Sequence, residues 1–171
     1  ASNGSEGGIR YALAAVKNVG SEAMAMLAAE RAAKGVFADL PDLLRRIPKE
    51  ACNRRQLENL IRAGALDSLH SNRRELLENI DTLLAYADTM QRDAQSSQDS
   101  LFGGSDALDS TVRLNPVDDW SGMDRLREEF EALGLYLSAH PLDDYIGRMD
   151  RRKVITANEL AVMIESRNIR P

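Results

Sequence analysis

The segment Gln98–Phe102, with the sequence Gln-Asp-Ser-Leu-Phe, has the side-chain chemistry of a docking peptide. It lies in a polar stretch, residues 92–118, that is rich in Ser, Asp and Gln and contains the pair Gly103-Gly104. Such a composition buries too little apolar surface to order a chain, so we expect a flexible linker. Because Leu101 and Phe102 stand side by side in it, they favour burial in a pocket on another protein, with the Gln98 amide hydrogen-bonding at the rim. The alternative is a linker that folds this apolar pair back onto its own domain.

Two glycine-containing turns, within residues 16–23 and 60–67, have the chemistry of anion sites. A turn that leads into a helix presents unpaired backbone N–H groups, and the helix dipole adds partial positive charge there. Together these features suit a phosphate, and such a contact carries no information about base sequence. The alternative is that the turns merely connect helices and that the nearby cations are solvated. The residues expected at a DNA surface are Lys17, Asn18, Val19, Gly20, Ser21, Arg62, Gly64, Ala65, Arg73 and Arg74.

The elements that position these turns are predicted to be helices. Apolar periodicity predicts helices over residues 9–16, 21–33, 39–47, 53–63 and 72–90. Ser21 and Asn53 are the expected N-caps of the second and fourth of these, and Asp39 is expected to start the third.

Beyond the linker, an amphipathic helix is expected over residues 123–137, and its predicted buried face carries Leu126, Phe130, Leu133 and Leu137. Thr156-x-x-Glu159 resembles a capping box that opens a last short helix. Only residues 153–155 offer a short strand pattern, so the predicted class is all-α.

Composition narrows the possible function classes. No apolar run approaches the roughly 18 residues of a membrane span, and Cys52 is the single cysteine, which excludes a disulfide framework and fits a reducing cytoplasm. The net charge is −5, but residues 1–80 carry 12 Lys and Arg against 10 Asp and Glu, whereas residues 81–171 carry 10 against 17. This asymmetry permits a DNA-binding surface in the first half. The carboxylates of residues 118–131 are interpreted as a solvated helix face, and His140, before Pro141, as a turn residue.

Four segments in this order resemble the alpha subunit of bacterial replicative DNA polymerase III in its clamp-binding region. They are residues 9–20, the run 60–69 with the sequence Leu-Ile-Arg-Ala-Gly-Ala-Leu-Asp-Ser-Leu, the Gln98–Phe102 segment, and residues 131–142 with the sequence Glu-Ala-Leu-Gly-Leu-Tyr-Leu-Ser-Ala-His-Pro-Leu. The two turns resemble a tandem helix-hairpin-helix unit, which binds the DNA backbone. The family hairpin prefers Gly at the position of Asn18, and Asn tolerates the left-handed conformation that this position requires.

The resemblance implies an architecture of five parts. These are a flexible N-terminal segment, a tandem helix-hairpin-helix domain, a flexible linker with the clamp-binding motif, an amphipathic helix with a turn, and the truncated approach to an OB-type domain, over residues 1–8, 9–91, 92–118, 119–147 and 148–171.

The resemblance also implies a function. A chain of this kind binds duplex DNA without sequence preference and tethers a DNA-directed DNA polymerase, a nucleotidyltransferase, to the beta sliding clamp through Gln98, Ser100, Leu101 and Phe102. Other polymerase III holoenzyme subunits are expected partners, the expected location is the bacterial cytoplasm, and no membrane is involved. No catalytic residue, metal ligand or cofactor is expected here, apart from a possible monovalent cation at a hairpin; Mg²⁺ is expected in the parent's palm domain.

Two other functions fit parts of the sequence. A DNA-repair protein can use the same tandem hairpins, and a helical protein-interaction module without a DNA role fits the acidic overall charge.

Overall fold

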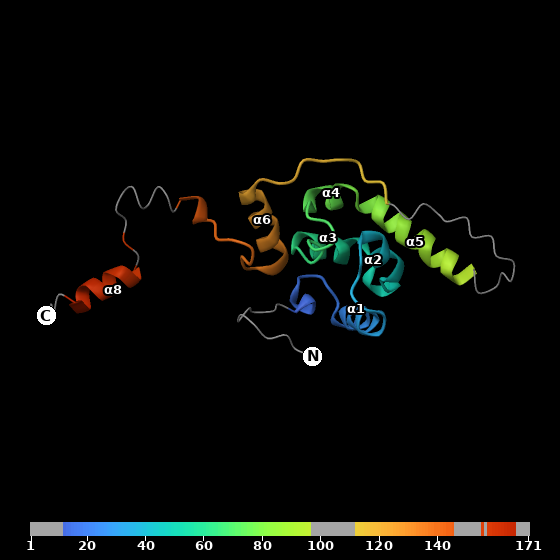
Figure 1. Cartoon of the computed structure of the whole chain (residues 1–171), viewed down its shortest axis with the longest axis horizontal. Helices are drawn as coiled ribbons and strands as arrows, with labels where there is room; N and C mark the ends of the chain where they lie inside the picture. The colour runs from blue at the N-terminus through green and yellow to red at the C-terminus, as the bar shows by residue number, and fades with distance from the viewer. Residues whose placement is uncertain (1–11, 97–111, 146–154, 156, 167–171) are drawn as a thin grey trace. The chain divides into compact units, whose positions relative to one another are not determined.

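The computed structural model describes residues 12–96, 112–145, 155 and 157–166, and within these ranges the regular structure is helical throughout (Figure 1). The predicted all-α class is therefore confirmed. The chain divides into two units, residues 1–137 and 138–171. The first contains a 3₁₀ turn η1 (Leu13–Ala15), α1 (Ser21–Lys34), α2 (Leu40–Arg46), a 3₁₀ turn η2 (Lys49–Ala51), α3 (Arg54–Arg62), α4 (Arg73–Glu78), α5 (Ile80–Ser96) and α6 (Gly122–Leu133).

Side-chain capping sets the start of most of these helices. The side chains of Asp39, Asn53, Asn72 and Ser121 each accept a hydrogen bond from the backbone N–H three residues later. The expected cap at Asn53 is thus confirmed, and the helix expected to start at Asp39 has that residue as its N-cap. At α1 the expectation was wrong, because Gly20 occupies the N-cap position and Ser21 is the first helical residue.

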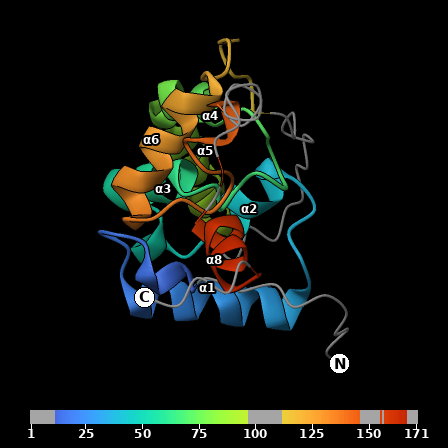
Figure 2. The same ribbon diagram turned by 90° about the vertical axis from the view of Figure 1, so that its left-hand side faces the viewer.

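The core of the first unit lies where α2, α3 and α5 meet, with α1 and α6 closing it from two sides (Figures 1 and 2). Its fully buried side chains include Leu44, Leu57, Ile61, Leu76 and Leu83. Burial of such side chains contributes roughly 1.5–3 kcal/mol each, which makes this cluster the main stabilising feature of the unit.

The long helix predicted over residues 72–90 is two helices, separated at Asn79. The buried Asn79 amide donates to the Glu75 carbonyl (2.8 Å) and to the Asn115 carbonyl (3.0 Å), and its Oδ1 accepts from the Asn115 N–H (2.8 Å). A side chain that bonds to nearby backbone in this way competes with the helical pattern. The second helix then continues to Ser96, beyond the predicted end at residue 90.

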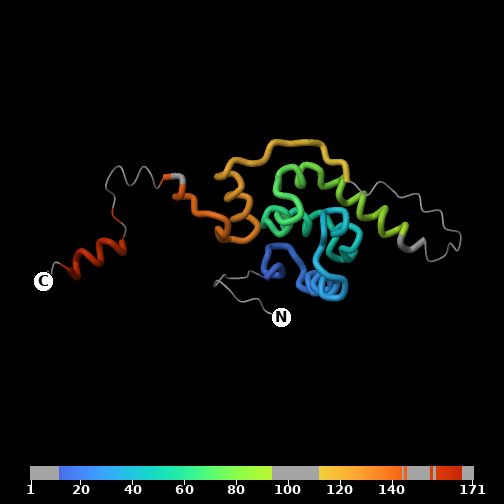
Figure 3. The backbone as a smooth tube through the Cα atoms, in the orientation of Figure 1, coloured from blue at the N-terminus to red at the C-terminus, as the bar shows by residue number. Residues whose placement is uncertain are grey.

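Both ends of the expected linker 92–118 are part of the folded unit. Residues 92–96 belong to α5, and Val112 and Leu114 pack against the core. The Asn72 amide donates to the Val117 carbonyl (2.7 Å), so residues 112–118 run along α4 as a strap (Figure 3). The rest of the expected linker, including Gln98–Phe102, lies outside the described residues.

Helix α6 packs against α3 within the first unit, with a different buried face from the predicted one. Leu126, Glu129, Ala132 and Leu133 are buried, whereas Phe130 and Leu137 are exposed. The interpretation of the carboxylates as a solvated face is therefore wrong for Glu129, which is 1% exposed.

The second unit contains a 3₁₀ turn η3 (Asp143–Tyr145) and α8 (Ala157–Ser166). The predicted last helix exists, while its expected cap Thr156 lies outside the described residues. His140 stands in a turn, as expected, where its N–H donates to Asp143 Oδ2 (2.7 Å).

Candidate nucleic-acid interface

The first hairpin joins η1 to α1 through a left-handed residue. Asn18 has φ 60, which confirms that asparagine takes the conformation for which a glycine is the usual choice. Val16 and Val19 are buried on either side of it, and the Val19 N–H donates to the Val16 carbonyl (3.2 Å). The turn is therefore anchored by its apolar residues and leaves Asn18 and Gly20 at the surface.

The N-terminus of α1 is the part of this hairpin that can receive an anion. No side chain caps it, and in the described part of the chain the N–H groups of Gly20 and Ser21 have no acceptor. These N–H groups and the helix dipole both favour a negative charge. The Glu22 carboxylate in the same turn acts in the opposite direction on an incoming phosphate.

Lys17 occupies the other side of the first hairpin and holds it to α6. Its backbone N–H donates to the Ala132 carbonyl (2.9 Å) and its Nζ donates to the Glu131 carbonyl (2.9 Å). A cation at this position complements the C-terminal end of the α6 dipole. Its main structural contact is therefore with α6, although the side chain remains at the surface.

The second hairpin differs from the first, because consecutive turns, not a helix, follow it over residues 63–69. The N–H groups of Gly64 and Ala65 donate to the carbonyls of Ile61 (3.0 Å) and Leu60 (2.9 Å), which they cap at the end of α3. The next helix, α4, begins only at residue 73 and is capped by Asn72. The N–H groups of Gly64 and Ala65 are thus bonded within the chain, unlike those of Gly20 and Ser21.

Arg73, predicted to contact DNA, is buried beneath the second hairpin. Its guanidinium makes a two-pronged contact with Asp67 (Nε to Oδ1 2.8 Å, Nη2 to Oδ2 2.7 Å), and its Nη1 donates to the Arg62 carbonyl (3.0 Å) and to Glu129 Oε2 (3.2 Å). Only 4% of the side chain is exposed. The expected surface role of Arg73 is therefore corrected to a structural one.

The same guanidinium explains the glycine at position 64. Gly64 has φ 77, and a Cβ there would collide with the Arg73 guanidinium. Burial alone would lower the pKa of Arg73, but the hydrogen bonds and charges of Asp67 and Glu129 outweigh it and raise that pKa. Arg73 thus stays charged and ties the second hairpin to α6.

Two other predicted cations differ in their availability. Arg62 lies at the end of α3 and its Nε is 3.0 Å from Glu128 Oε2 on α6, with the Arg62 side chain 30% exposed. Arg74 is 42% exposed, and its contacts with Glu78 (3.9 Å) and the Asp118 carbonyl (3.5 Å) are long. Of the arginines expected near the second hairpin, Arg74 is the most available to a phosphate.

Two exposed cations outside the predicted DNA surface, Arg55 and Lys49, lie on elements that pack near α1. The first turn of α3 lies beside Gly20, since Gln56 Nε2 would be 3.5 Å from a Cβ at that position. Arg55 precedes Gln56, and η2, which contains Lys49, packs against α1. In the described ranges, neither Arg55 nor Lys49 forms an ion pair and both are exposed. The fold thus places Arg55 near the first hairpin, 35 residues from Gly20 in the sequence, and Lys49 against α1.

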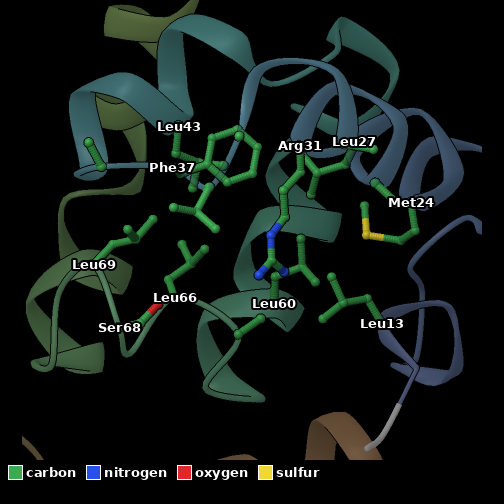
Figure 4. A pocket seen from close by; sticks show the side chains of 16 residues that line it. Leu13, Met24, Leu27, Arg31, Phe37, Leu43, Leu60, Leu66, Ser68 and Leu69 are labelled. Atoms are coloured by element: carbon green, nitrogen blue, oxygen red, sulfur yellow. The ribbon is translucent and has the colours of Figure 1, made fainter. Parts of the chain in front are cut away.

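A pocket of about 820 Å³ lies between α1, the loop that follows it and the residues after α3 (Figure 4). Its lining is mainly apolar and includes Leu13, Met24, Leu27, Phe37, Leu60 and Leu66, with the Arg31 side chain pointing into it. Apolar walls do not suit a phosphate backbone, so this pocket is separate from the candidate interface.

The described part of the chain contains neither a candidate metal site nor a membrane-spanning helix. No group of three or more His, Cys, Asp and Glu side chains there could hold a metal ion. No helix there has the length and apolar character needed to cross a membrane.

Comparison with known proteins agrees with these features. A model of the helix-hairpin-helix motif matches residues 2–76. The chain is 42% identical over 160 residues to the DNA polymerase III subunit alpha of Caulobacter vibrioides, which covers 94% of this chain and 14% of the relative. It is 43% identical over 137 residues to that of Neisseria meningitidis serogroup B (80% and 12%) and 42% identical over 138 residues to that of Mycobacterium leprae (79% and 12%). The chain thus spans about an eighth of the length of these relatives.

Proposed function

This chain is a homologue of one segment of the bacterial DNA polymerase III alpha subunits, and on that premise we propose that it binds the backbone of duplex DNA without sequence preference. The observation that carries the proposal is the uncapped N-terminus of α1 at Gly20 and Ser21. Backbone N–H groups there meet a phosphate oxygen and contact no base, so every sequence is bound alike.

The other residues of the first hairpin shape it and hold it in place. Asn18 gives the turn its left-handed bend, Val19 fills the core beneath it, and Lys17 fixes the hairpin to α6. Arg55 adds positive charge near the N-terminus of α1, and each phosphate that a cation neutralises releases counterions. Arg74 supplies the accessible charge of a secondary contact, since Arg62 is paired with Glu128 and the N–H groups of Gly64 and Ala65 are bonded within the chain.

A pair of substitutions at Ser21 tests the role of the backbone N–H. Ser21→Pro removes this N–H, and the first helical position tolerates proline, especially since Gly20 is extended (φ −73, ψ 131). Ser21→Ala removes the hydroxyl and keeps the N–H, so it is the matched control. Loss of one hydrogen bond to a charged phosphate, worth roughly 1.5–3 kcal/mol, should weaken duplex binding about tenfold or more in the proline variant. Fluorescence anisotropy with labelled duplexes measures it.

Two further variants report on charge. Glu22→Gln removes the opposing carboxylate from the first turn of α1 and should tighten binding about twofold to fivefold, by the roughly 0.3–1 kcal/mol of a helix-terminus charge. Arg55→Ala should reduce the salt dependence, in log–log form, by about 0.9. Equal affinities for Ser21→Pro and Ser21→Ala would contradict the proposed contact, as would strong preference for one duplex sequence.

We also propose that Gln98, Ser100, Leu101 and Phe102 bind the beta sliding clamp. These residues lie outside the described part of the structure, and the support is the Gln-x-Ser-Leu-Phe pattern together with the similarity to the polymerase subunits. Titration calorimetry with purified clamp should give an affinity in the micromolar range, and Leu101→Ala/Phe102→Ala should lose about 2 kcal/mol or more. Asp99→Ala, within the same segment, is the control that should retain the affinity. An unchanged affinity in the double variant would refute this assignment.

The two contacts together define the role of the chain in a replicative polymerase. The clamp encircles DNA, so a weak hairpin contact and a weak peptide contact reinforce each other through effective concentration. The name of the relatives implies nucleotidyl transfer, and we place this activity in the parts of those proteins that the chain does not span. A primer-extension assay with the chain alone should therefore give no product; extended primer would contradict that assignment.

A further inference from the structure

Two stacked aromatic rings stand at the surface where α6 ends. The ring centroids of Phe130 and Tyr136 are 4.9 Å apart with planes inclined by 29°. Phe130 is 44% exposed and Tyr136 is 41% exposed. The left-handed Gly134 (φ 79) ends the helix and turns the chain back, which brings Tyr136 alongside Phe130. The pair therefore offers an aromatic surface to solvent instead of filling the core.

This aromatic pair adjoins the first hairpin. Lys17 of the hairpin donates to the Glu131 and Ala132 carbonyls, at the positions that directly follow Phe130. A Cβ at Gly134 would lie 3.9 Å from Lys17 Nζ. Figures 1 and 2 both place the end of α6 beside the hairpin. A nucleic acid held at the N-terminus of α1 would thus have this aromatic surface as its neighbour.

A cation lies on the same face of α6. Arg127 precedes Phe130 by three residues, a spacing that brings side chains together on a helix surface. Its side chain is 69% exposed, and its ion pair with Asp124 is long at 3.7 Å. An aromatic surface next to an accessible cation has the composition with which proteins bind single-stranded nucleic acid.

We propose that Phe130 and Tyr136 form a stacking site for an unpaired base, so that the chain binds the junction between duplex and single-stranded DNA. The inference rests on the proposed DNA contact of the first hairpin, which would hold the duplex side. Every base has a π face, so stacking is sequence-tolerant and fits a hairpin that reads no sequence.

The test compares three DNA probes with the 171-residue chain: a blunt duplex, the same duplex with a short single-stranded overhang, and the isolated single strand. The overhang should tighten binding about tenfold, the increment expected of one stacked base. Phe130→Leu keeps apolar bulk and removes the ring face, so it should abolish this increment and leave the blunt-duplex affinity unchanged. Phe130→Trp should retain the increment. Met123→Ala, which removes another exposed apolar side chain of α6, is the matched control and should behave as wild type.

The outcomes separate this inference from the function on which it rests. Equal affinity of wild type for blunt and overhang duplexes would overturn the stacking site and leave the hairpin contact intact. A Phe130→Leu variant that loses affinity for both duplexes equally would show a structural role for the ring and would also overturn it. Binding of single strand that depends on Phe130, without binding of blunt duplex, would support the stacking site and refute the duplex contact. Absence of binding to all three probes would refute both.

Discussion

Replacement of Arg73 by methionine should unfold the first unit far more readily than any change to its neighbour Arg74. Arg73 is 4% exposed and makes hydrogen bonds to Asp67, Glu129 and a backbone carbonyl. Methionine keeps much of the side-chain length and removes every one of these bonds. The substitution therefore isolates the charge and its hydrogen bonds from the apolar stem.

The loss of unfolding free energy depends on the contacts that Asp67 and Glu129 retain without Arg73. Asp67 is 33% exposed and retains Arg125, whose Nη2 is 2.8 Å from its Oδ2. Glu129 is 1% exposed, loses the Arg73 guanidinium, and still accepts a hydrogen bond from the Leu137 N–H. The cost is therefore dominated by a buried carboxylate without its cation, and removal of one partner from a buried pair costs roughly 3–5 kcal/mol. Since domains of this size have a total stability of about 5–15 kcal/mol, such a loss would be severe.

Urea unfolding followed by circular dichroism measures this loss. Arg74→Met is the matched control, because the side chain is 42% exposed with long contacts, and it should change stability by no more than about 0.5 kcal/mol. The double variant Arg73→Met/Glu129→Leu removes the stranded carboxylate and should recover a large part of the loss. A structural role for the Arg73–Glu129 pair is refuted if Arg73→Met is no more destabilising than Arg74→Met. It is also refuted if the loss of unfolding free energy in the double variant equals the sum of the losses in Arg73→Met and Glu129→Leu.

Three further outcomes are expected. Asn79→Ala should cost roughly 1–3 kcal/mol, because it removes the two hydrogen bonds that join the Asn79 side chain to the Asn115 backbone, and it should speed amide hydrogen exchange at Asn115. Asn18→Val should destabilise the chain by about 1–2 kcal/mol, whereas Asn18→Gly should be nearly neutral in the same urea titration, since position 18 is left-handed. The hydrogen bond from Lys34 chiefly lowers the pKa of Glu30, and the backbone N–H of Ala38 chiefly lowers that of Asp42. The stability that these two carboxylates confer should therefore be present above the ordinary carboxyl pKa values. It should be lost as the pH falls through their lower pKa values in the folded state. Glu30→Gln/Asp42→Asn should flatten that acid-side decline; an unchanged decline would contradict it.

Features that depend on neighbouring residues were predictable from the sequence. The caps at Asp39 and Asn53 follow from side chains that reach backbone three residues away. The left-handed Asn18 follows from its place in a hairpin pattern with an asparagine where glycine is usual. Arg46 lies four residues after Asp42 on α2, a spacing that favours a pair, and the two side chains are 2.9 Å apart.

Features that depend on distant residues were not predictable in this way. Arg73 and Arg74 have the same chemistry and are adjacent in sequence, yet only Arg73 meets the buried Glu129, 56 residues later. The break at Asn79 depends on Asn115, 36 residues later. Helical periodicity found α6 but placed Phe130 inside, because a pattern of apolar residues does not indicate that a buried guanidinium requires a carboxylate in the core.

The second hairpin shows the same limit for the site itself. Its sequence contains the expected glycine and cations, but Gly64 serves a close approach by Arg73, and the local N–H groups cap α3. The two turns, each with a glycine, therefore differ in structure: the N–H groups at the start of α1 are unpaired among the described residues, whereas those of Gly64 and Ala65 are bonded to α3.

Backbone amide NMR of the chain titrated with a blunt DNA duplex tests whether the N-terminus of α1 binds phosphate. The amide signals of Gly20 and Ser21 should shift most, in the same way for duplexes of different sequence, and return as salt is raised. The signals of Gly64 and Ala65, whose N–H groups are already bonded within the chain, should shift little. Large shifts at Gly64 and Ala65 with none at Gly20 and Ser21 would refute the proposed DNA contact of α1.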